Sequence, residues 1–215
     1  MTKFGTKRET SSEEFLNAEK LLAPTPENAY LLGFIWGDGC LNPHGYSVRV
    51  EIKREDYNCI QQIFSTDLGW KVSYRERPGR QPQAAPYLSN KRYREYLNEH
   101  GFKTKTINDP DLVLASLSKE LHRHWWHGYF DSDGCIYVNP KWSTFQIAFT
   151  GHVDLTWKSG IELLDSLEIK PQIRVIHNKN SYSQLRFTKR SDVEKFLNWI
   201  HKDVDFGLQR KHKSW

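Results

Sequence analysis

Residues 31–39 read LLGFIWGDG, and a second stretch at residues 126–134 reads WHGYFDSDG. When the two stretches are aligned, their small residues coincide, and so does the Asp-Gly pair with which each of them ends. The match continues into a cysteine and an Asn-Pro pair, with Cys40 and Asn42 in the first copy and Cys135 and Asn139 in the second. We interpret this as one internal repeat, a pattern that decides the architecture before any single element is assigned.

The same succession of patterns follows each copy. Residues 47–53 and 144–150 alternate apolar and polar side chains, which is typical of strands with one buried face. A helix-like stretch comes next at 55–64 and 154–167, then a strand at 70–75 and 171–176, then a closing segment at 87–97 and 185–197. Each half therefore reads helix–strand–strand–helix–strand–strand–helix. We predict an α+β fold of two pseudo-twofold-related αββαββα halves.

The expected organisation has five parts, with boundaries taken from composition and from turn signals. Thr25 is a good N-cap for the first repeat helix, Pro26 fits its first turn, and Gly39 supplies its end. The acidic, proline-containing stretch that starts at Asn108 is typical of a linker. The parts are an N-terminal arm or short docking helix (1–24), an N-terminal half (25–106), a linker (107–116), a C-terminal half (117–204) and a basic tail (205–215).

Small residues recur four positions apart inside both repeat stretches, Gly33 with Gly37 and Gly128 with Ser132. A glycine inside a helix costs roughly 1 kcal/mol relative to alanine, so the stripe needs a structural reason. Small residues on one face let two helices approach closely, and we expect the two repeat helices to pack against each other along this stripe.

This packing predicts a pair of neighbouring carboxylates. Asp38 and Asp133 each follow the stripe by one residue, at a helix C-terminus where the macrodipole is negative. A divalent cation relieves the repulsion between two such groups, and hard oxygen ligands suit Mg²⁺. Two metal-bound carboxylates on a twofold axis can serve displacement reactions at two related phosphates.

The two aligned stretches resemble the paired motifs of a monomeric LAGLIDADG homing endonuclease, over about residues 25–203. The resemblance implies that the motif helices form the central interface and that antiparallel strands form a saddle over double-stranded DNA. It also implies Mg²⁺-dependent (or Mn²⁺-dependent) cleavage of both strands of a long asymmetric site, across the minor groove.

The resemblance also assigns roles to particular residues. Asp38 and Asp133 would hold the metal ions, together with the backbone carbonyls of Gly37 and Ser132. The side chains matched to the surroundings of the attacking water are Lys91 and Lys189, expected in the closing strands, and Lys53. Members of the family often have a glutamine near the position of Lys53. This chain has Lys53 there in one half and Thr150 in the other. The first motif also departs from the second by carrying Trp36 where the second has Asp131.

The outward face of the strands is the expected DNA surface. Arginine and glutamine can pair with base edges in the major groove, whereas lysine more often contacts phosphate. The two faces differ in composition, so we expect an asymmetric target. The candidates are Ser47, Arg49, Glu51, Lys71, Ser73, Arg75, Arg77 and Arg80 in the first half, and Thr144, Gln146, Arg174, Lys179, Gln184 and Arg186 in the second. The basic tail is a further candidate for phosphate contact.

Composition agrees with a polyanionic partner. The chain has 215 residues, 31 Lys and Arg against 26 Asp and Glu, and a formal net charge of +5, with a pI near 9.0. No apolar run approaches the roughly 18 residues that a membrane span needs, and the N-terminus lacks the apolar segment of a secretory signal. Three cysteines without a CxxC pair favour a reduced environment. We therefore expect an intracellular, soluble monomer.

Two other functions share the same sequence pattern. One is an RNA-binding intron maturase, and the other is a catalytically silent DNA-binding protein. His124, His127 and Asp131 fall on one helical face beside His122, a spacing that could hold Zn²⁺. No further ligand completes that set in the sequence, and a polar helix face is the expected interpretation. No G-x-S-x-G elbow and no P-loop are present.

Overall fold

The computed structural model describes residues 12–139, 141, 144–177 and 181–212 of the chain. The first half contains α2 (Pro26–Asp38), β1 (Gly39–Leu41), β2 (Ser47–Val50), β3 (Ile52–Lys53), α3 (Arg54–Ile60), β4 (Lys71–Arg75), β5 (Gln83–Ser89) and α4 (Lys91–Glu99). The second half contains α6 (Lys119–Asp133), β6 (Gly134–Asn139), β7 (Thr144–His152), α7 (Lys158–Ser166), β8 (Gln172–Ile176), β9 (Tyr182–Phe187) and α8 (Arg190–His201). The predicted α+β fold class, with two similar halves, is confirmed.

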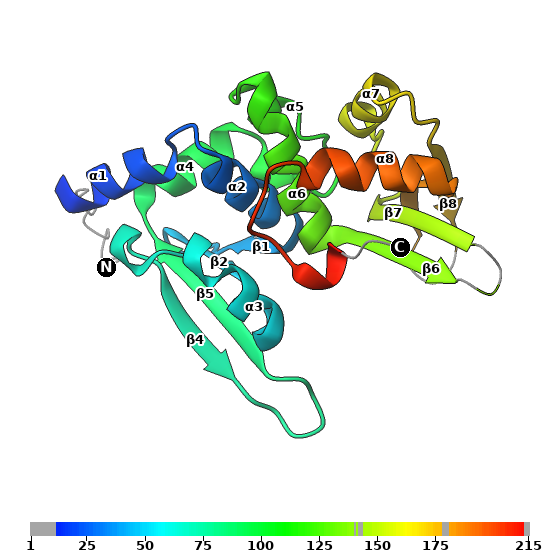
Figure 1. Ribbon diagram of the computed structural model, residues 1–215. Coiled ribbons are helices and arrows are strands. Elements are labelled where there is room, and N and C mark those ends of the chain that lie inside the picture. The colour runs from blue at the N-terminus through cyan, green and yellow to red at the C-terminus, as the bar shows by residue number, and fades with distance from the viewer. Residues whose placement is uncertain (1–11, 140, 142–143, 178–180, 213–215) are drawn as a thin grey trace.

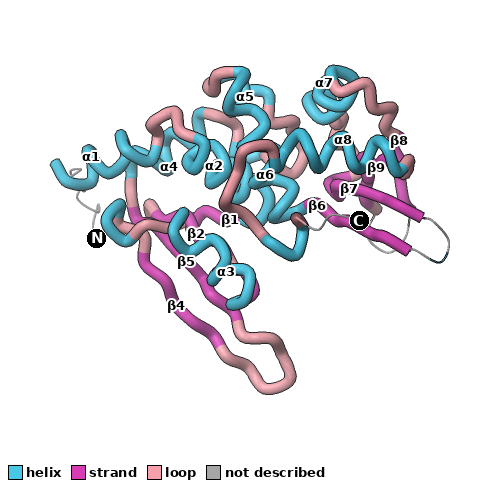
Figure 2. The backbone as a smooth tube through the Cα atoms, viewed as in Figure 1, coloured by secondary structure: helices cyan, strands magenta, loops and turns pink. Residues whose placement is uncertain are grey.

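Each half builds one antiparallel sheet, and the strand orders correspond. The first sheet runs β1-β2-β5 with β4 on the far side of β5, and the second runs β6-β7-β9-β8. The long β7 of the second half corresponds to two pieces in the first, because Glu51 interrupts the ladder between β2 and β3. Figure 2 shows most of the helices along one side of the molecule and the strands along the other.

Helices α2 and α6 cross at the centre of the molecule, with one sheet on either side of them (Figure 1). A β-carbon on Gly33 would lie 1.9 Å from the Trp125 carbonyl oxygen, and one on Gly128 would lie 1.9 Å from the Tyr30 carbonyl oxygen. Side chains cannot fit at such distances, so glycine is required for this approach of two backbones. The aromatic residues on the other faces of both helices join one buried core that runs through the two halves.

The ends of α2 follow directly from its sequence. The Thr25 side chain accepts a hydrogen bond from the Asn28 N–H at 3.2 Å, as its N-cap position predicts. At the other end, Gly39 has an extended backbone with φ −73°. This glycine is needed for space, since a β-carbon there would lie 2.3 Å from the Ile35 carbonyl oxygen.

The segments before and between the two halves each contain a short helix. In the N-terminal arm, α1 (Ser12–Leu21) docks on α4, and the Asn90 side-chain amide donates to the Glu14 carbonyl at 2.7 Å. The linker contains a helix, α5 (Asp111–Ala115), and Asp111 pairs with Lys158 of the second half at 3.1 Å. No helix among the described residues has the length and apolar character of a membrane span.

The C-terminal segment, predicted as a basic tail that contacts phosphate, folds back onto the protein in its described part, and the prediction is wrong for Lys211. Two short 3₁₀ turns, η3 (Phe102–Thr104) and η5 (Gln209–Lys211), follow the closing helices of the two halves. Lys211 is only 3% exposed, and Arg210 forms a bidentate pair with Asp56, at 2.8 and 2.9 Å. The segment folds back against α6, which buries Lys211 and leaves Arg210 exposed. Residues 213–215 lie outside the described part.

Candidate metal and nucleic-acid site

Asp38 and Asp133 are the last residues of α2 and α6, and the close crossing brings these helix ends together. Solvent reaches both side chains, yet protein surrounds them closely enough to remove part of their hydration. The pKa of Asp38 is raised to about 6, by this desolvation and by the negative charge of Asp133. Burial raises the pKa of Asp133 as well, against the opposing effect of Lys105 and Lys211. The two carboxylates therefore act on each other, as the crossing predicts.

Two lysines bind the backbone carbonyls at the C-terminal ends of α2 and α6. The Lys105 ammonium donates to the carbonyls of Trp36, Gly37 and Gly39, at 2.6, 2.6 and 2.8 Å. The Lys211 ammonium makes the matching contacts on α6, to the carbonyls of Phe130, Asp131 and Gly134 at 2.6, 2.7 and 2.6 Å. Each lysine thus satisfies the free carbonyls at a helix C-terminus and opposes its negative dipole.

Two cavities flank the aspartates, and each draws on both halves of the chain. A cavity of about 110 Å³ is lined by Asp133 together with Gly37, Lys105, Thr150 and His152. A second cavity, of about 210 Å³, is lined by Asp38 together with Ser132, Lys53, Gln83 and Arg210. The sequence alignment of Lys53 with Thr150 is wrong by the strand register, because Gly39 pairs with Val50 and Gly134 with Phe149. The register matches Lys53 with His152, and each lines the cavity beside one aspartate.

The carboxylates have the character that a divalent cation requires. They are two hard anionic ligands, and partial desolvation together with repulsion from Asp133 raises the pKa of Asp38. The other expected ligands fit less simply. The Gly37 carbonyl already accepts from Lys105, and the role of the Ser132 carbonyl stays a prediction. The two carboxylates are therefore the groups that fit Mg²⁺ best.

The expected placement of Lys91 and Lys189 in closing strands is wrong. Lys91 is the first residue of α4, with its ammonium 3.9 Å from Glu95, and Lys189 is the N-cap of α8. The register places both beyond the strand ends that lie away from the aspartates. In the first half, Ser89 pairs with Ser47, three residues along β2 from the partner of Gly39, which is about 10 Å. Lys105, Lys211 and Lys53 are the lysines that the structure places near the aspartates.

Residues 120–201 match the family model of the LAGLIDADG-like domain. The whole chain is similar in structure to the N-terminal LAGLIDADG domain of DUF199/WhiA, at 19% identity and a TM-score of 0.52, covering 93% of this chain and 95% of that one. This chain has the two-domain LAGLIDADG fold. The LAGLIDADG meganuclease I-AabMI bound to uncleaved DNA shares it, at 17% identity, a TM-score of 0.53 and 87% of each chain. So does the homing endonuclease I-GzeII in complex with its DNA target, at 10% identity, a TM-score of 0.55, and 88% and 87% of the chains. No curated protein sequence matches the chain.

The LAGLIDADG helices α2 and α6 differ at the position held by Trp36 and Asp131. Trp36 packs against Trp125, with ring centroids 5.9 Å apart. Asp131 is buried and accepts from the Tyr30 hydroxyl at 2.8 Å and from the Leu208 N–H at 2.7 Å. Asp131 therefore ties the C-terminal segment to the two LAGLIDADG helices.

The strand faces of the LAGLIDADG fold carry the polar residues predicted for DNA contact. In the first sheet, Arg49 and Arg75 converge on Glu51, at 3.4 and 2.5 Å. Arg77 and Arg80 line a cavity of about 310 Å³ beside them. By register Ser47, Lys71 and Ser73 lie on the same face as Arg49.

In the second sheet, two polar rows cross the strands. Arg174, Gln184 and Thr150 form one, with the Gln184 amide donating to the Thr150 hydroxyl at 3.2 Å. Arg186 donates to Gln172 at 3.1 Å in the next row. Gln146 shares this face. Thr144 is exposed at the start of β7. Lys179 lies outside the described residues.

A short sequence signal could have revealed the helix-capping lysines. Residues 101–105 read GFKTK and residues 207–211 read GLQRK, so each half closes with glycine, an apolar residue and a lysine at the same spacing. Both glycines have positive φ, 88° for Gly101 and 119° for Gly207, which favours glycine. The repeat therefore extends past the closing helices, into the turns that carry Lys105 and Lys211.

Proposed function

We propose that the protein is a site-specific endonuclease of double-stranded DNA, a homing endonuclease that uses Mg²⁺ or Mn²⁺. The observation that carries the proposal is the pair of mutually repelling carboxylates, Asp38 and Asp133, at the ends of two crossed helices. Structures with the same fold are described as endonucleases bound to DNA. A pure binding protein gains nothing from two anionic groups that would face DNA phosphates.

The roles of the chain's own residues follow from their positions. Asp38 and Asp133 would hold the metal ions, which supply an activated water and stabilise the charge on the leaving oxygen. Lys105 and Lys211 hold the helix ends rigid and keep the site from being strongly negative. Lys53 lies in the cavity of Asp38, where its ammonium can bind a phosphate or orient a water. Thr150, in the cavity of Asp133, can hydrogen bond but adds no charge.

DNA recognition would use the polar faces of the two sheets. Arginine and glutamine side chains can pair bidentately with guanine and adenine. The first face gathers arginines around Glu51, whereas the second carries Arg174, Arg186 and the glutamines Gln146, Gln172 and Gln184. Because the faces differ, we propose a long target without twofold symmetry, bound by one copy of the chain.

A second candidate is a DNA-binding protein that does not cut. It is favoured by the likeness to DUF199/WhiA, which is named for its LAGLIDADG domain and not as an endonuclease. Binding of intron RNA has no comparable observation in its favour.

Selection of cleaved sites from a random duplex library in Mg²⁺ tests the proposal. We expect recovery of one asymmetric family of sites, with cleavage lost in Asp38→Asn while binding to the recovered site persists. The control is Asp165→Asn, an exposed aspartate at the end of α7, which should cut normally. Enrichment of bound but uncut duplexes would favour the silent DNA-binding protein, and preferential retention of structured RNA would favour the maturase. Normal cutting by Asp38→Asn would refute the site assignment.

A further inference from the structure

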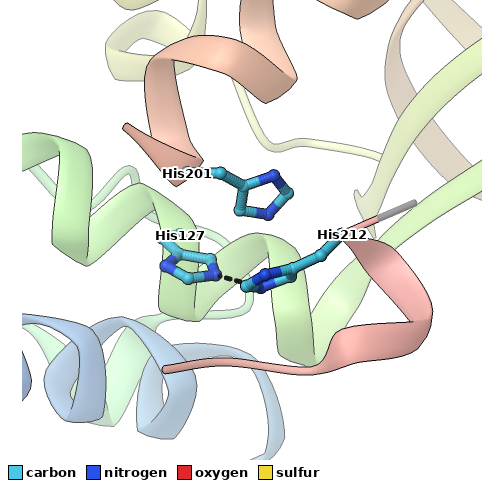
Figure 3. Close-up of side chains that lie close together, drawn as sticks. All are labelled: His127, His201 and His212. Carbon is cyan, nitrogen blue, oxygen red and sulfur yellow. Dashed lines mark hydrogen bonds between the residues drawn. The ribbon is translucent and has the colours of Figure 1, made fainter. Parts of the chain in front are cut away.

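Three histidines from distant parts of the chain meet beside α6 (Figure 3). His127 lies in the middle of α6, His201 ends α8, and His212 follows the turn η5. One ring nitrogen from each lies within 4.8 Å of the other two. The His127 and His212 Nε2 atoms are 3.1 Å apart, and the rings of His201 and His212 have centroids 3.9 Å apart.

Hydrogen bonding within the protein does not satisfy this cluster. The Nε2 atom of His201 is buried without a partner among the described residues. Buried polar atoms normally have partners, so each such atom calls for an explanation. In a tetrahedral zinc site with Zn–N bonds near 2.0–2.1 Å, two ligand nitrogens lie about 3.3 Å apart. The observed 3.1 Å between the two Nε2 atoms is close to that separation.

The surroundings of the cluster suit a cation. The Asp131 Oδ2 atom lies 3.4 Å from His127 Nε2, and its Oδ1 atom is buried without a partner. Gly207 passes close by, and a β-carbon there would lie 2.6 Å from the Nε2 atoms of both His127 and His212. The absence of a side chain at this position keeps the space beside the two nitrogens open.

We propose that His127, His201 and His212 bind one Zn²⁺ ion, with the fourth position open to a water molecule. Three imidazoles and one water are a ligand set that zinc accepts. The ion ties the end of α8 and the C-terminal turn to α6, and so holds Lys211 under the end of that helix. None of the three histidines lines the cavities of Asp38 and Asp133, so zinc uptake at this site can be measured separately from DNA cleavage.

Titration of the full-length, chelator-treated protein with Zn²⁺ alone tests the site. We expect uptake of one equivalent, a higher midpoint of thermal unfolding, and the intense visible absorption of tetrahedral cobalt when Co²⁺ replaces zinc. His212→Ala should bind at least about tenfold more weakly. His44→Ala, which removes an exposed histidine from the β1–β2 turn, should bind like the parent protein, and so should Asp38→Asn.

His212→Cys separates loss of a ligand from loss of the fold. A thiolate at this position should retain the metal and add a sulfur-to-cobalt charge-transfer band in the near ultraviolet. The proposal is overturned if the parent takes up no zinc, if Co²⁺ gives only the weak spectrum of an octahedral ion, or if His212→Ala and His44→Ala bind zinc equally.

Discussion

Lys105 and Lys211 occupy equivalent places in the two halves, each with its ammonium enclosed by the carbonyls at the end of a LAGLIDADG helix. The shortest of these contacts are 2.6 Å in both halves. Burial lowers the pKa of each lysine to about 8, although nearby aspartates act in the opposite direction. The charged lysines are thus costly to bury and are retained by several short hydrogen bonds each, which makes them central to the geometry of the helix ends.

Replacing Lys105 by methionine removes the ammonium and leaves an apolar chain of similar length. Carbonyls of α2 then lose a charged donor, and we expect the free energy of unfolding to fall by about 2–3 kcal/mol. Denaturant unfolding of Lys105→Met measures the change. The neighbouring, exposed Lys103→Met should change stability by less than about 0.5 kcal/mol. Equal stability of the two variants would show that Lys105 does not stabilise the helix end.

Asp38 is expected to reduce stability while serving the site. Its folded pKa of about 6 lies above the unfolded value near 3.8, so between these values the folded chain holds the proton that the unfolded chain has lost. Folding stability from this group is therefore lost as pH rises through about 6. In metal-free buffer above pH 7 we expect Asp38→Asn to be about 1 kcal/mol more stable than the parent, a figure reduced because water reaches the side chain.

The pH dependence of that gain distinguishes it from a packing effect. The advantage of Asp38→Asn should shrink towards zero as pH falls well below 3.8, where the parent aspartate is protonated in both states. Thermal unfolding at several pH values measures it, and Asp165→Asn serves as the control because it removes an exposed aspartate from the last turn of α7. A gain of equal size at low and neutral pH would contradict the explanation by charge.

The repeat and its glycine stripe were enough to predict the fold and the meeting of Asp38 with Asp133. Both depend on local patterns that a duplicated chain shows twice. The roles of Lys105 and Lys211 were not predicted from the sequence. Lys105 lies 68 residues from Gly37, and Lys211 lies 77 residues from Gly134, so only the folded chain brings them to the helix ends. The histidine cluster was not predicted for the same reason, since His201 and His212 reach His127 only through tertiary packing.

The helix crossing itself can be tested at Gly128. A β-carbon there would lie 1.9 Å from the Tyr30 carbonyl oxygen, so Gly128→Ala forces the LAGLIDADG helices apart. We expect a loss of about 3 kcal/mol or more in unfolding free energy, or failure to fold. Gly45→Ala is the matched control, since a β-carbon there meets only the Asn42 side chain, at 3.2 Å. A stable Gly128→Ala protein would mean that the crossing is looser than described.

Glu51 should restrain the affinity of the first sheet for DNA. Its carboxylate lies 3.4 Å from Arg49 and 2.5 Å from Arg75, so it neutralises charge on the face proposed to meet phosphates. Glu51→Gln releases both arginines, and we expect tighter binding to nonspecific duplex DNA. The logarithmic salt dependence should steepen by about 0.9 for each added phosphate contact.

Binding of a fluorescent duplex over a range of salt concentrations measures this change. Glu168→Gln is the control, because it also removes an exposed acid paired with a base, Lys195 at 3.0 Å, but outside the strand faces. Arg75→Gln should shift the salt dependence in the opposite direction to Glu51→Gln. If Glu51→Gln and Glu168→Gln bind with the same slope, the arginines around Glu51 do not contact the phosphate backbone, and the DNA surface must lie elsewhere.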